Sequence, residues 1–304
     1  MHPSKHLAAG TLAEVPTPTR QVGLASSPLH RDHGPVRIAR SDYLWFAVRV
    51  TAGAEDPLWL LQHSLPSPFR LEGTLGLAAL PGFGLRVSDR AGVRRQEFDS
   101  AWARAEHAYA MVHRTMMDRA SAEGWVGIRA AQVDLRGTRI LIAGPPGTGK
   151  TTLALGLAAR GGTIGSDEVV LLREGHAVAL PRRLRLLHDA TTHLPERARE
   201  SAVELPYAPP VDAVDPGRLT PSPPLVAPRV PKLLVLLTPG THDPIVSEAS
   251  PLQVIAELST GAAPMSPDRG KLIGELSRLQ RNVRCVRLTG RADDHGVDAL
   301  ESLV

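Results

Sequence analysis

Short apolar runs along the first third of the chain predict a β-rich segment that ends in a long helix. VRIARSDYLWFAVRV (residues 36–50) is followed by LWLLQ, FRLEG, LGLAAL and FGLRVSD, which are separated by Pro or Gly. In residues 99–124 the apolar side chains recur at steps of three and four, and Asp99 or Ser100 is the expected N-cap. We therefore expect a β-rich amino-terminal domain with a long helix over residues 36–124.

The pattern changes near Trp125, where strand and helix signals alternate. GWVGIRAAQVDL and RGTRILIAG predict two strands joined by a tight turn at Arg136–Gly137. TTLALGLAARGG predicts a helix that ends at Gly161, and EVVLL, HAVAL and LRLL predict short strands with a turn at Gly175. Residues 125–304 thus predict a second domain of the α/β class.

The rest of this domain carries further strand and helix signals. KLLVLLT (residues 232–238) predicts a fully buried strand, VRCVRL a last strand, and DDHGVDALESLV a last helix. Ser250 before Pro251 and Ser266 before Pro267 are the expected starts of two more helices, because Ser suits the N-cap and Pro the first helical position.

Two segments lack periodicity. Residues 1–35 are rich in Pro, Ser, His and Gly, and we expect them to form a loosely ordered tail. Residues 206–231 are rich in proline, and we expect a linker or a flap without regular elements there.

Composition narrows the classes of function. The 304 residues include 42% hydrophobic and 22% charged side chains, with no apolar run long enough for a membrane span or a signal peptide, so we expect a cytoplasmic protein without a membrane partner. The formal charge is +4 and the pI about 9.6, but the excess comes from dispersed arginines and only 4% of residues are aromatic. We therefore expect no nucleic-acid partner.

The cysteine and histidine residues indicate no disulfide and no metal site. The single cysteine, Cys285, excludes an internal disulfide and a cysteine zinc site, and its apolar surroundings predict a buried strand residue. No H-x-x-x-H pair of histidines occurs in a helical pattern, so a histidine metal site is not expected.

One glycine-rich stretch points to nucleotide chemistry. GPPGTGKT, with an apolar strand before it and an amphipathic helix after it, satisfies G-x-x-x-x-G-K-S/T. In such a loop the backbone N–H groups and the helix N-terminus cradle phosphates, the lysine reaches the β and γ phosphates, and the hydroxyl ligates Mg²⁺. We expect ATP or GTP with Mg²⁺. The candidate contact residues are Gly144, Pro145, Pro146, Gly147, Thr148, Gly149, Lys150, Thr151 and Thr152.

An acidic pair, Asp167 and Glu168, follows the helix that the loop opens. The apolar run EVVLL comes after the acids, so we expect them on a short connection that returns from the helix. Near a bound triphosphate, Asp167 could accept the proton of an attacking hydroxyl, and both carboxylates could help Thr151 to hold Mg²⁺. The alternative is that Ser166 and Asp167 only form a turn or an exposed strand entry.

These residues resemble a known family. RAAQVDLRGTRILIAGPPGTGKTTLALGLAARGGTIGSDEVVLL (residues 129–172) is similar to the core of the HPr serine kinase/phosphorylase family, which is related in fold to the phosphoenolpyruvate carboxykinases. The resemblance implies a P-loop kinase core with a smaller β-rich amino-terminal domain. It also implies that Asp167 is the catalytic general base toward a serine and that Glu168 is the second acid, where the family usually has Asp-Asp.

The chain departs from the family at several positions. Arg129 stands where the family has a histidine that contacts phosphate, and arginine binds phosphate but does not exchange a proton at neutral pH. Thr151-Thr152 replaces Ser-Glu, and the later glycine-rich signature is missing. The chain then resembles divergent HPr-kinase-like proteins, including kinases that phosphorylate lasso-peptide precursors. The expected acceptor is a serine of a peptide or small protein, and self-association stays open.

Two other functions stay open. GPPGTGKT also occurs in P-loop ATPases of the AAA+ or motor type, but these need an acid after a later buried strand, and KLLVLLT ends in Thr-Pro-Gly. A nucleotide-binding regulatory module without catalysis is the third candidate.

Three arginines follow the acidic pair in sequence. Arg182, Arg183 and Arg185 lie in PRRLRLL, and one of them could steady a transferring phosphoryl group. A solvated strand face is the commoner role of such a group, and we expect it here.

Overall fold

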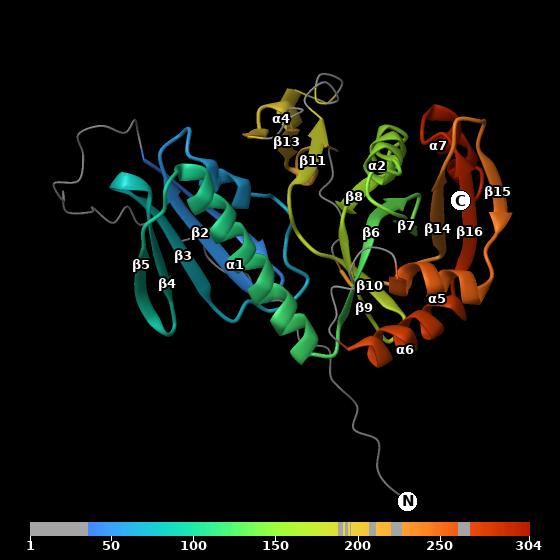
Figure 1. Ribbon diagram of the computed structural model, residues 1–304, viewed down its shortest axis with the longest axis horizontal. Coiled ribbons are helices and arrows are strands. Elements are labelled where there is room, and N and C mark those ends of the chain that lie inside the picture. Colours follow the sequence, from blue (N-terminus) through green and yellow to red (C-terminus); the bar gives the residue numbers. More distant parts are fainter. Residues whose placement is uncertain are drawn as a thin grey trace, which may run out of the picture. The chain divides into compact units, whose positions relative to one another are not determined.

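The computed structural model describes residues 36–187, 191, 194, 196–206, 211–219, 227–260 and 268–304, without the side chain of Thr260. These residues lie in the compact unit formed by residues 34–304. Their fold is mixed α/β, as the sequence predicts (Figure 1). The expected tail, residues 1–35, lies outside the described residues.

A five-stranded sheet forms the first part of the described chain. Its strands, in sheet order, are β1 (Arg37–Tyr43), β2 (Phe46–Ala52), β3 (Thr74–Leu80), β4 (Gly84–Asp89) and β5 (Gly92–Gln96). Neighbouring strands are antiparallel except β2 and β3, which are parallel. The short 3₁₀ helix η2 (Pro81–Phe83) connects β3 to β4.

The chain between β2 and β3 does not form the expected strands. LWLLQ belongs mainly to a 3₁₀ helix, η1 (Pro57–Leu61), because Pro57 occupies its first turn and Asp56 Oδ1 accepts a hydrogen bond from the N–H of Leu58 at 2.9 Å. FRLEG forms no regular element, and β3 begins only at Thr74. Apolar content alone therefore predicted too many strands here.

The long helix is α1 (Ala101–Ala122), and its prediction is confirmed. Ser100 is the N-cap, with its Oγ accepting from the N–H of Ala103 at 3.0 Å. The helix buries Ala105, Val112 and Met116 in the cluster that also contains the inner side chains of the five-stranded sheet. None of the helices in the described part of the chain combines the length and apolar character that a membrane span needs.

A mixed sheet forms the centre of the second part. In sheet order its strands are β10 (His176–Ala179), β9 (Val169–Arg173), β6 (Val126–Leu135), β7 (Thr138–Ala143), β14 (Leu233–Pro239), β16 (Arg284–Gly290) and β15 (Ile245–Glu248), and β8 (Thr163–Ser166) also pairs with β6. The β7, β14 and β16 strands are parallel. The predicted turn at Arg136–Gly137 is confirmed, with φ angles of 49° and 81°.

Helices cover both faces of this sheet (Figure 1). Alternate residues of β7 point to opposite faces: Ile140 and Ile142 share a cluster with α2 (Lys150–Ala159) and α7 (Asp294–Glu301). Leu141 and Ala143 share another with α5 (Pro251–Thr260) and α6 (Arg269–Gln280). The predicted buried strand KLLVLLT is confirmed as β14, which buries residues on both faces.

The two predicted Ser-Pro helix starts have different outcomes. Ser250 caps α5, because its Oγ accepts from the N–H of Gln253 at 3.3 Å. The N-cap of α6 is Asp268, whose Oδ1 accepts from the N–H of Lys271 at 3.0 Å, and not Ser266. Ser266 and Pro267 lie outside the described residues.

A small three-stranded sheet has the order β11 (Leu184–Leu187), β13 (Val211–Val214) and β12 (Val203–Leu205). The β13 strand lies inside residues 206–231, so the expectation of no regular element there is wrong. It forms because Ala213 and Val214 are buried while both edges of the strand are paired. In the chain, the short helix α4 (Glu196–Arg199) lies between β11 and β12, and η3 (Pro216–Arg218) follows β13.

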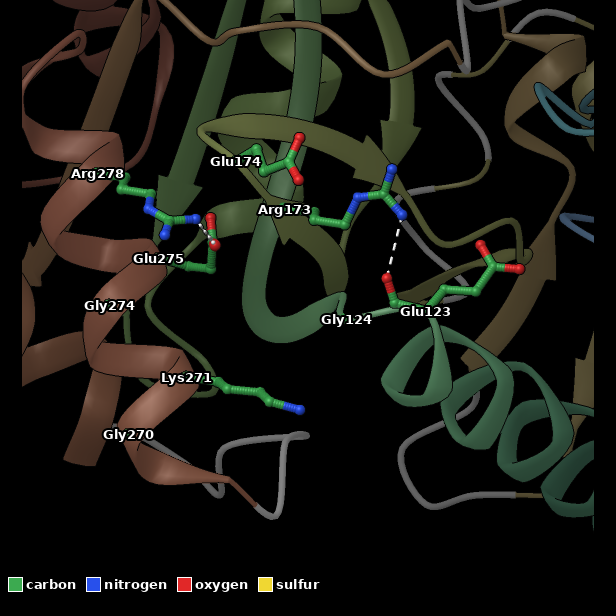
Figure 2. A pocket seen from close by; sticks show the side chains of 9 residues that line it. All are labelled: Glu123, Gly124, Arg173, Glu174, Gly270, Lys271, Gly274, Glu275 and Arg278. Atoms are coloured by element: carbon green, nitrogen blue, oxygen red, sulfur yellow. Dashed lines mark hydrogen bonds and ion pairs between the residues drawn. The ribbon is translucent and has the colours of Figure 1, made fainter.

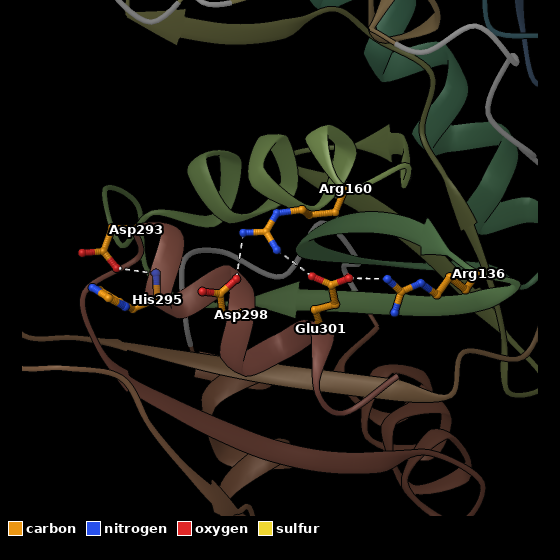
Figure 3. A network of polar contacts seen from close by, with 6 residues as sticks. All are labelled: Arg136, Arg160, Asp293, His295, Asp298 and Glu301. Atoms are coloured by element: carbon orange, nitrogen blue, oxygen red, sulfur yellow. Dashed lines mark hydrogen bonds and ion pairs between the residues drawn. The ribbon is translucent and has the colours of Figure 1, made fainter.

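The last helix is fixed to α2 by an ionic network (Figure 3). Arg160, just after α2, donates to Asp298 at 2.7 Å and to Glu301 at 2.8 Å, and Arg136 in the β6–β7 turn also pairs with Glu301. Asp293 caps α7 through the N–H of His295 at 3.1 Å. These contacts hold α7 against the helix that follows the glycine-rich loop.

Candidate functional site

The glycine-rich loop, Gly144–Thr151, connects β7 to α2 at the carboxyl end of a central strand, which is where open α/β sheets bind ligands. The predicted strand-loop-helix context is therefore present. Lys150 Nζ donates to the carbonyl oxygens of Gly144 at 2.9 Å and Pro145 at 2.7 Å, and Thr148 Oγ1 also donates to Pro145 at 2.8 Å. The lysine thus lies over carbonyls of its own loop.

The shape of the loop depends on Gly149, the N-cap of α2. Its φ of +94° lies in the left-handed region, and a Cβ placed there would lie 2.2 Å from the Cβ of Ala292. No other residue type fits this position without movement. Pro145 and Pro146 are exposed on the loop, and Thr152 is exposed on the first turn of α2.

The acidic pair lies between β8 and β9. The preceding segment TIGS, for which the sequence predicted no element, is the short strand β8, which pairs with β6. Ser166 Oγ accepts from the N–H groups of Glu168 at 3.3 Å and Val169 at 3.2 Å, so the pair sits on a tight turn. Asp167 is only 6% exposed, so the alternative of an exposed strand entry is wrong for it, while a turn is present.

Asp167 faces the start of α2. Its Oδ2 accepts from Thr151 Oγ1 at 3.4 Å and from the N–H of Arg185 at 3.4 Å. Its Oδ1 is buried and receives no hydrogen bond from the described residues. The structure therefore joins the loop hydroxyl to the carboxylate through Oδ2.

Arg182 is the functional candidate whose role the sequence reasoning misjudged. It is 5% exposed, its Nη2 lies 3.5 Å from Asp167 Oδ1, and its Nη1 pairs with Glu168. Burial alone would lower its pKa, but Tyr109 and Asp167 outweigh that effect and the net pKa is raised. Arg182 therefore stays charged beside the acidic pair.

The expected solvated face is wrong for two of the three arginines. Arg182 and Arg183 are both buried, while Arg185 is exposed with its guanidinium over the ring of Tyr109, 5.3 Å from the centroid. A signal existed in the sequence, because Arg182 and Arg183 stand between the apolar runs HAVAL and LRLL.

Strand β6 carries Arg129 between the loop and the acidic pair. The register pairs Arg129 with Val169, next to Glu168, and pairs the following Ala130 with Ala143, next to the loop. Arg129 Nε is buried without a hydrogen-bond partner in the described residues. This position suits a guanidinium that would meet an anion held by the loop.

The charges of these groups act on one another. Burial lowers the pKa of Lys150, the positive charge of Arg129 lowers it further, and Asp167 opposes both effects. Two cations and one carboxylate therefore surround the start of α2. An added anion would relieve the repulsion between Lys150 and Arg129.

The donor set fits magnesium better than a metal held by protein ligands alone. Among the described residues, no group of three or more His, Cys, Asp or Glu side chains could hold a metal ion. Mg²⁺ usually takes one or two carboxylates together with substrate phosphates and water. Thr151, Asp167 and Glu168 can supply that set, although Glu168 is engaged by Arg182.

Cys285 lies in β16 and is buried, as the sequence predicts. Burial raises the pKa of its thiol to about 11, with a smaller effect of Glu248 in the same direction. The thiol is therefore protonated at neutral pH, which argues against a nucleophilic role.

A cavity of about 670 Å³ lies between the end of α1 and α6 (Figure 2). None of its lining residues belongs to the loop or the acidic pair. Arg278 pairs with Glu275 at 2.9 Å, and Arg173 donates to the carbonyl of Glu123 at 3.1 Å. Because nothing connects this lining to the loop or the acidic pair, we assign no function to this cavity.

The chain matches no protein-family model, and no curated protein is similar enough to count as a match.

Proposed function

We propose that this protein is a Mg-nucleotide-dependent kinase that transfers the γ-phosphate to a serine hydroxyl of a peptide or small protein. Its core would be a P-loop kinase core of the HPr kinase/phosphoenolpyruvate carboxykinase type, working in the cytoplasm. The observation that supports this most is the hydrogen bond between Thr151 Oγ1 and Asp167 Oδ2, since it joins the loop hydroxyl to a buried carboxylate.

The loop would bind the nucleotide phosphates through its N–H groups and the N-terminus of α2. Lys150 would exchange the carbonyls of Gly144 and Pro145 for the β and γ phosphate oxygens, which are stronger acceptors. Arg129 would add a second cation at the terminal phosphate. The buried Nε of Arg129, which has no partner in the described chain, supports this role.

Thr151 and Asp167 would hold Mg²⁺ at the loop, and Glu168 would contribute directly or through water. When bound, the metal would neutralise negative charge on the phosphate oxygens. Glu168 can reach the metal only if it leaves Arg182. Arg182 would then keep its contact with Asp167 alone.

The two oxygens of Asp167 suit two tasks. Oδ2 stays with Thr151, and Oδ1, which accepts no hydrogen bond from the described residues but lies 3.5 Å from Arg182 Nη2, would face the acceptor. Asp167 would take the proton of the serine hydroxyl while that oxygen forms its bond to the γ phosphorus and the bond to the β–γ bridging oxygen breaks. The nucleoside diphosphate then leaves with both bridging electrons.

The test is incubation with γ-labelled ATP or GTP, Mg²⁺ and a serine-bearing peptide. The proposal predicts label on the peptide and its loss in Lys150→Ala, because this substitution removes the cation at the phosphates. Lys271→Ala is the matched control, since Lys271 is an exposed lysine on α6.

The other outcomes contradict the proposal in different ways. Release of inorganic phosphate without transfer would indicate an ATPase, and binding with neither reaction would indicate a regulatory module. The β14 strand argues against the ATPase: it lies beside β7, parallel to it, and ends in Thr238 and Pro239 with no acid.

A further inference from the structure

A second cavity, of about 420 Å³, lies where β1, η1, α4 and η3 meet. Its charged lining consists of four arginines and two carboxylates: Arg37, Arg183, Arg197, Arg218, Glu200 and Asp215. No residue of the glycine-rich loop or the acidic pair lines it. It is therefore a site separate from the proposed catalytic one.

Arg183 forms the base of this cavity. It is 5% exposed and donates only to neutral carbonyl oxygens, those of Gln62, Ser201 and Ala213. These bonds use Nε and Nη1, and Nη2 makes no hydrogen bond with the described residues. Burial lowers the pKa of Arg183 to about 10, with Asp215 acting in the opposite direction. A buried guanidinium without an ion pair is costly unless an anion compensates it.

The other arginines of the cavity also lack carboxylate partners. Within the described ranges, no ion pair joins Arg37, Arg197 or Arg218 to a carboxylate, and Arg197 Nε donates to the carbonyl of Arg218 at 2.9 Å. Arg218 acts on Arg183 as a like charge and disfavours its protonated form. Arg183 and Arg218 therefore repel each other within this cavity.

Asp215, the buried carboxylate of the cavity, is already bound elsewhere. Its Oδ2 accepts from Ser64 Oγ at 2.8 Å and its Oδ1 accepts from the N–H of Gly217 at 3.0 Å. Asp215 lowers the net positive charge of the cavity, but it lies at hydrogen-bond distance from none of the four arginines. The cavity thus keeps excess positive charge.

We propose that this cavity binds an oxyanion, a carboxylate or phosphate group of a small ligand, held by Arg183 Nη2 together with Arg37 and Arg218. The planar guanidinium fork matches both groups in geometry. Ile38 and Trp59 provide apolar walls, so a ligand with a short apolar part fits the lining.

The test is calorimetric titration of the full chain at low ionic strength with glutarate and, separately, with inorganic phosphate. Arg37→Gln and Arg218→Gln should each weaken binding at least about ten-fold, since each removes a charge-assisted contact. Both side chains are exposed, so the fold should be retained, and a melting curve checks this. Arg95→Gln, an exposed arginine on β5, is the matched control and should leave binding unchanged.

A second arm separates this cavity from the glycine-rich loop. Lys150→Ala should leave glutarate binding intact, and any phosphate binding that it removes belongs to the loop. Binding of glutarate alone identifies a carboxylate ligand, and binding of phosphate that survives Lys150→Ala identifies a phosphate group. The proposal is overturned if neither anion binds with a dissociation constant below ~10 mM, or if both arginine variants bind as the wild type does.

Discussion

Arg182 Nη2 lies 3.5 Å from Asp167 Oδ1, and both side chains are only 5% exposed. The guanidinium also pairs with Glu168, which is 34% exposed. One buried cation therefore holds two adjacent carboxylates that would otherwise repel each other. This contact fixes the direction in which the acidic pair faces the loop.

Arg182→Gln should lower both stability and turnover. The substitution leaves Asp167 buried without its cation, which costs about 3 kcal/mol of unfolding free energy. Phosphate transfer at saturating nucleotide should fall at least about ten-fold, because the carboxylate loses its fixed direction. The nucleotide dissociation constant should change less than about three-fold, since Arg182 is not part of the loop. Denaturant unfolding, calorimetry and transfer kinetics measure the three quantities.

Arg182→Lys is the control for this prediction. It keeps the positive charge but not the fork that contacts both carboxylates. Compared with Arg182→Gln, the Arg182→Lys variant should recover more of the unfolding free energy than of the turnover number. A wild-type turnover number in Arg182→Gln would contradict the prediction that Arg182 positions the acidic pair.

Gly149→Ala should disrupt the loop more than Gly147→Ala. Both glycines have positive φ angles, +94° and +76°, but a Cβ at Gly149 meets Ala292 at 2.2 Å and a Cβ at Gly147 meets nothing within 4 Å. The backbone alone costs roughly 1–2 kcal/mol at either position. Urea unfolding should show an additional loss for Gly149→Ala, together with weaker nucleotide binding.

The double variant Gly149→Ala/Ala292→Gly isolates the clash. This double variant should recover the unfolding free energy that Gly149→Ala loses through the clash. Only the cost of the left-handed backbone should remain. Equal stability of Gly149→Ala and Gly147→Ala would contradict this explanation of the loop's shape.

Stability should fall as the pH drops from about 6.5 toward 4, in part because of His63. Burial lowers the pKa of this 4% exposed histidine to about 4, with Arg183 also lowering it and Asp215 opposing. Between these values the unfolded chain binds one more proton at this site than the native chain does. The contribution of the neutral His63 to the free energy of unfolding is therefore fully present above pH 6.5. Below that pH it falls by up to about 1.4 kcal/mol per pH unit.

Unfolding free energies measured from pH 7 to 5 in wild type and His63→Asn check this effect. The slope should be smaller in His63→Asn and unchanged in His107→Asn, which alters an exposed histidine on α1. Identical slopes in wild type and His63→Asn would show that His63 is protonated equally in both states.

Features of the site that depend on neighbouring residues could be read from the sequence. The GPPGTGKT loop, the helix after it and the tight turn at Arg136–Gly137 are each specified by residues close in the chain, and the structure contains all of them. The placement of Asp167 just after this helix also follows from local order. Chain order alone did not reveal that Asp167 is buried.

Features that depend on pairing between distant segments could not be read in this way. Whether Arg182 is solvated or buried depends on distant residues, the carboxylates opposite it among them, and the short runs HAVAL and LRLL around it look like ordinary strands. The strand β13 is stabilised by pairing with β11 and β12, which outweighs the nearby prolines. Conversely, LWLLQ is apolar enough for a strand, but Pro57 and the Asp56 cap favour a 3₁₀ helix.

The central claim is that Asp167 acts on the phosphoryl group held by the loop, and Asp167→Asn tests it most directly. The variant keeps the size of the side chain but cannot accept the proton of a serine hydroxyl. Asp118→Asn, at an exposed carboxylate on α1, is the matched control. We predict that Asp167→Asn binds nucleotide within about three-fold of wild type and transfers phosphate to a serine peptide at least ~100-fold more slowly. Transfer by Asp167→Asn at the wild-type rate would contradict the account.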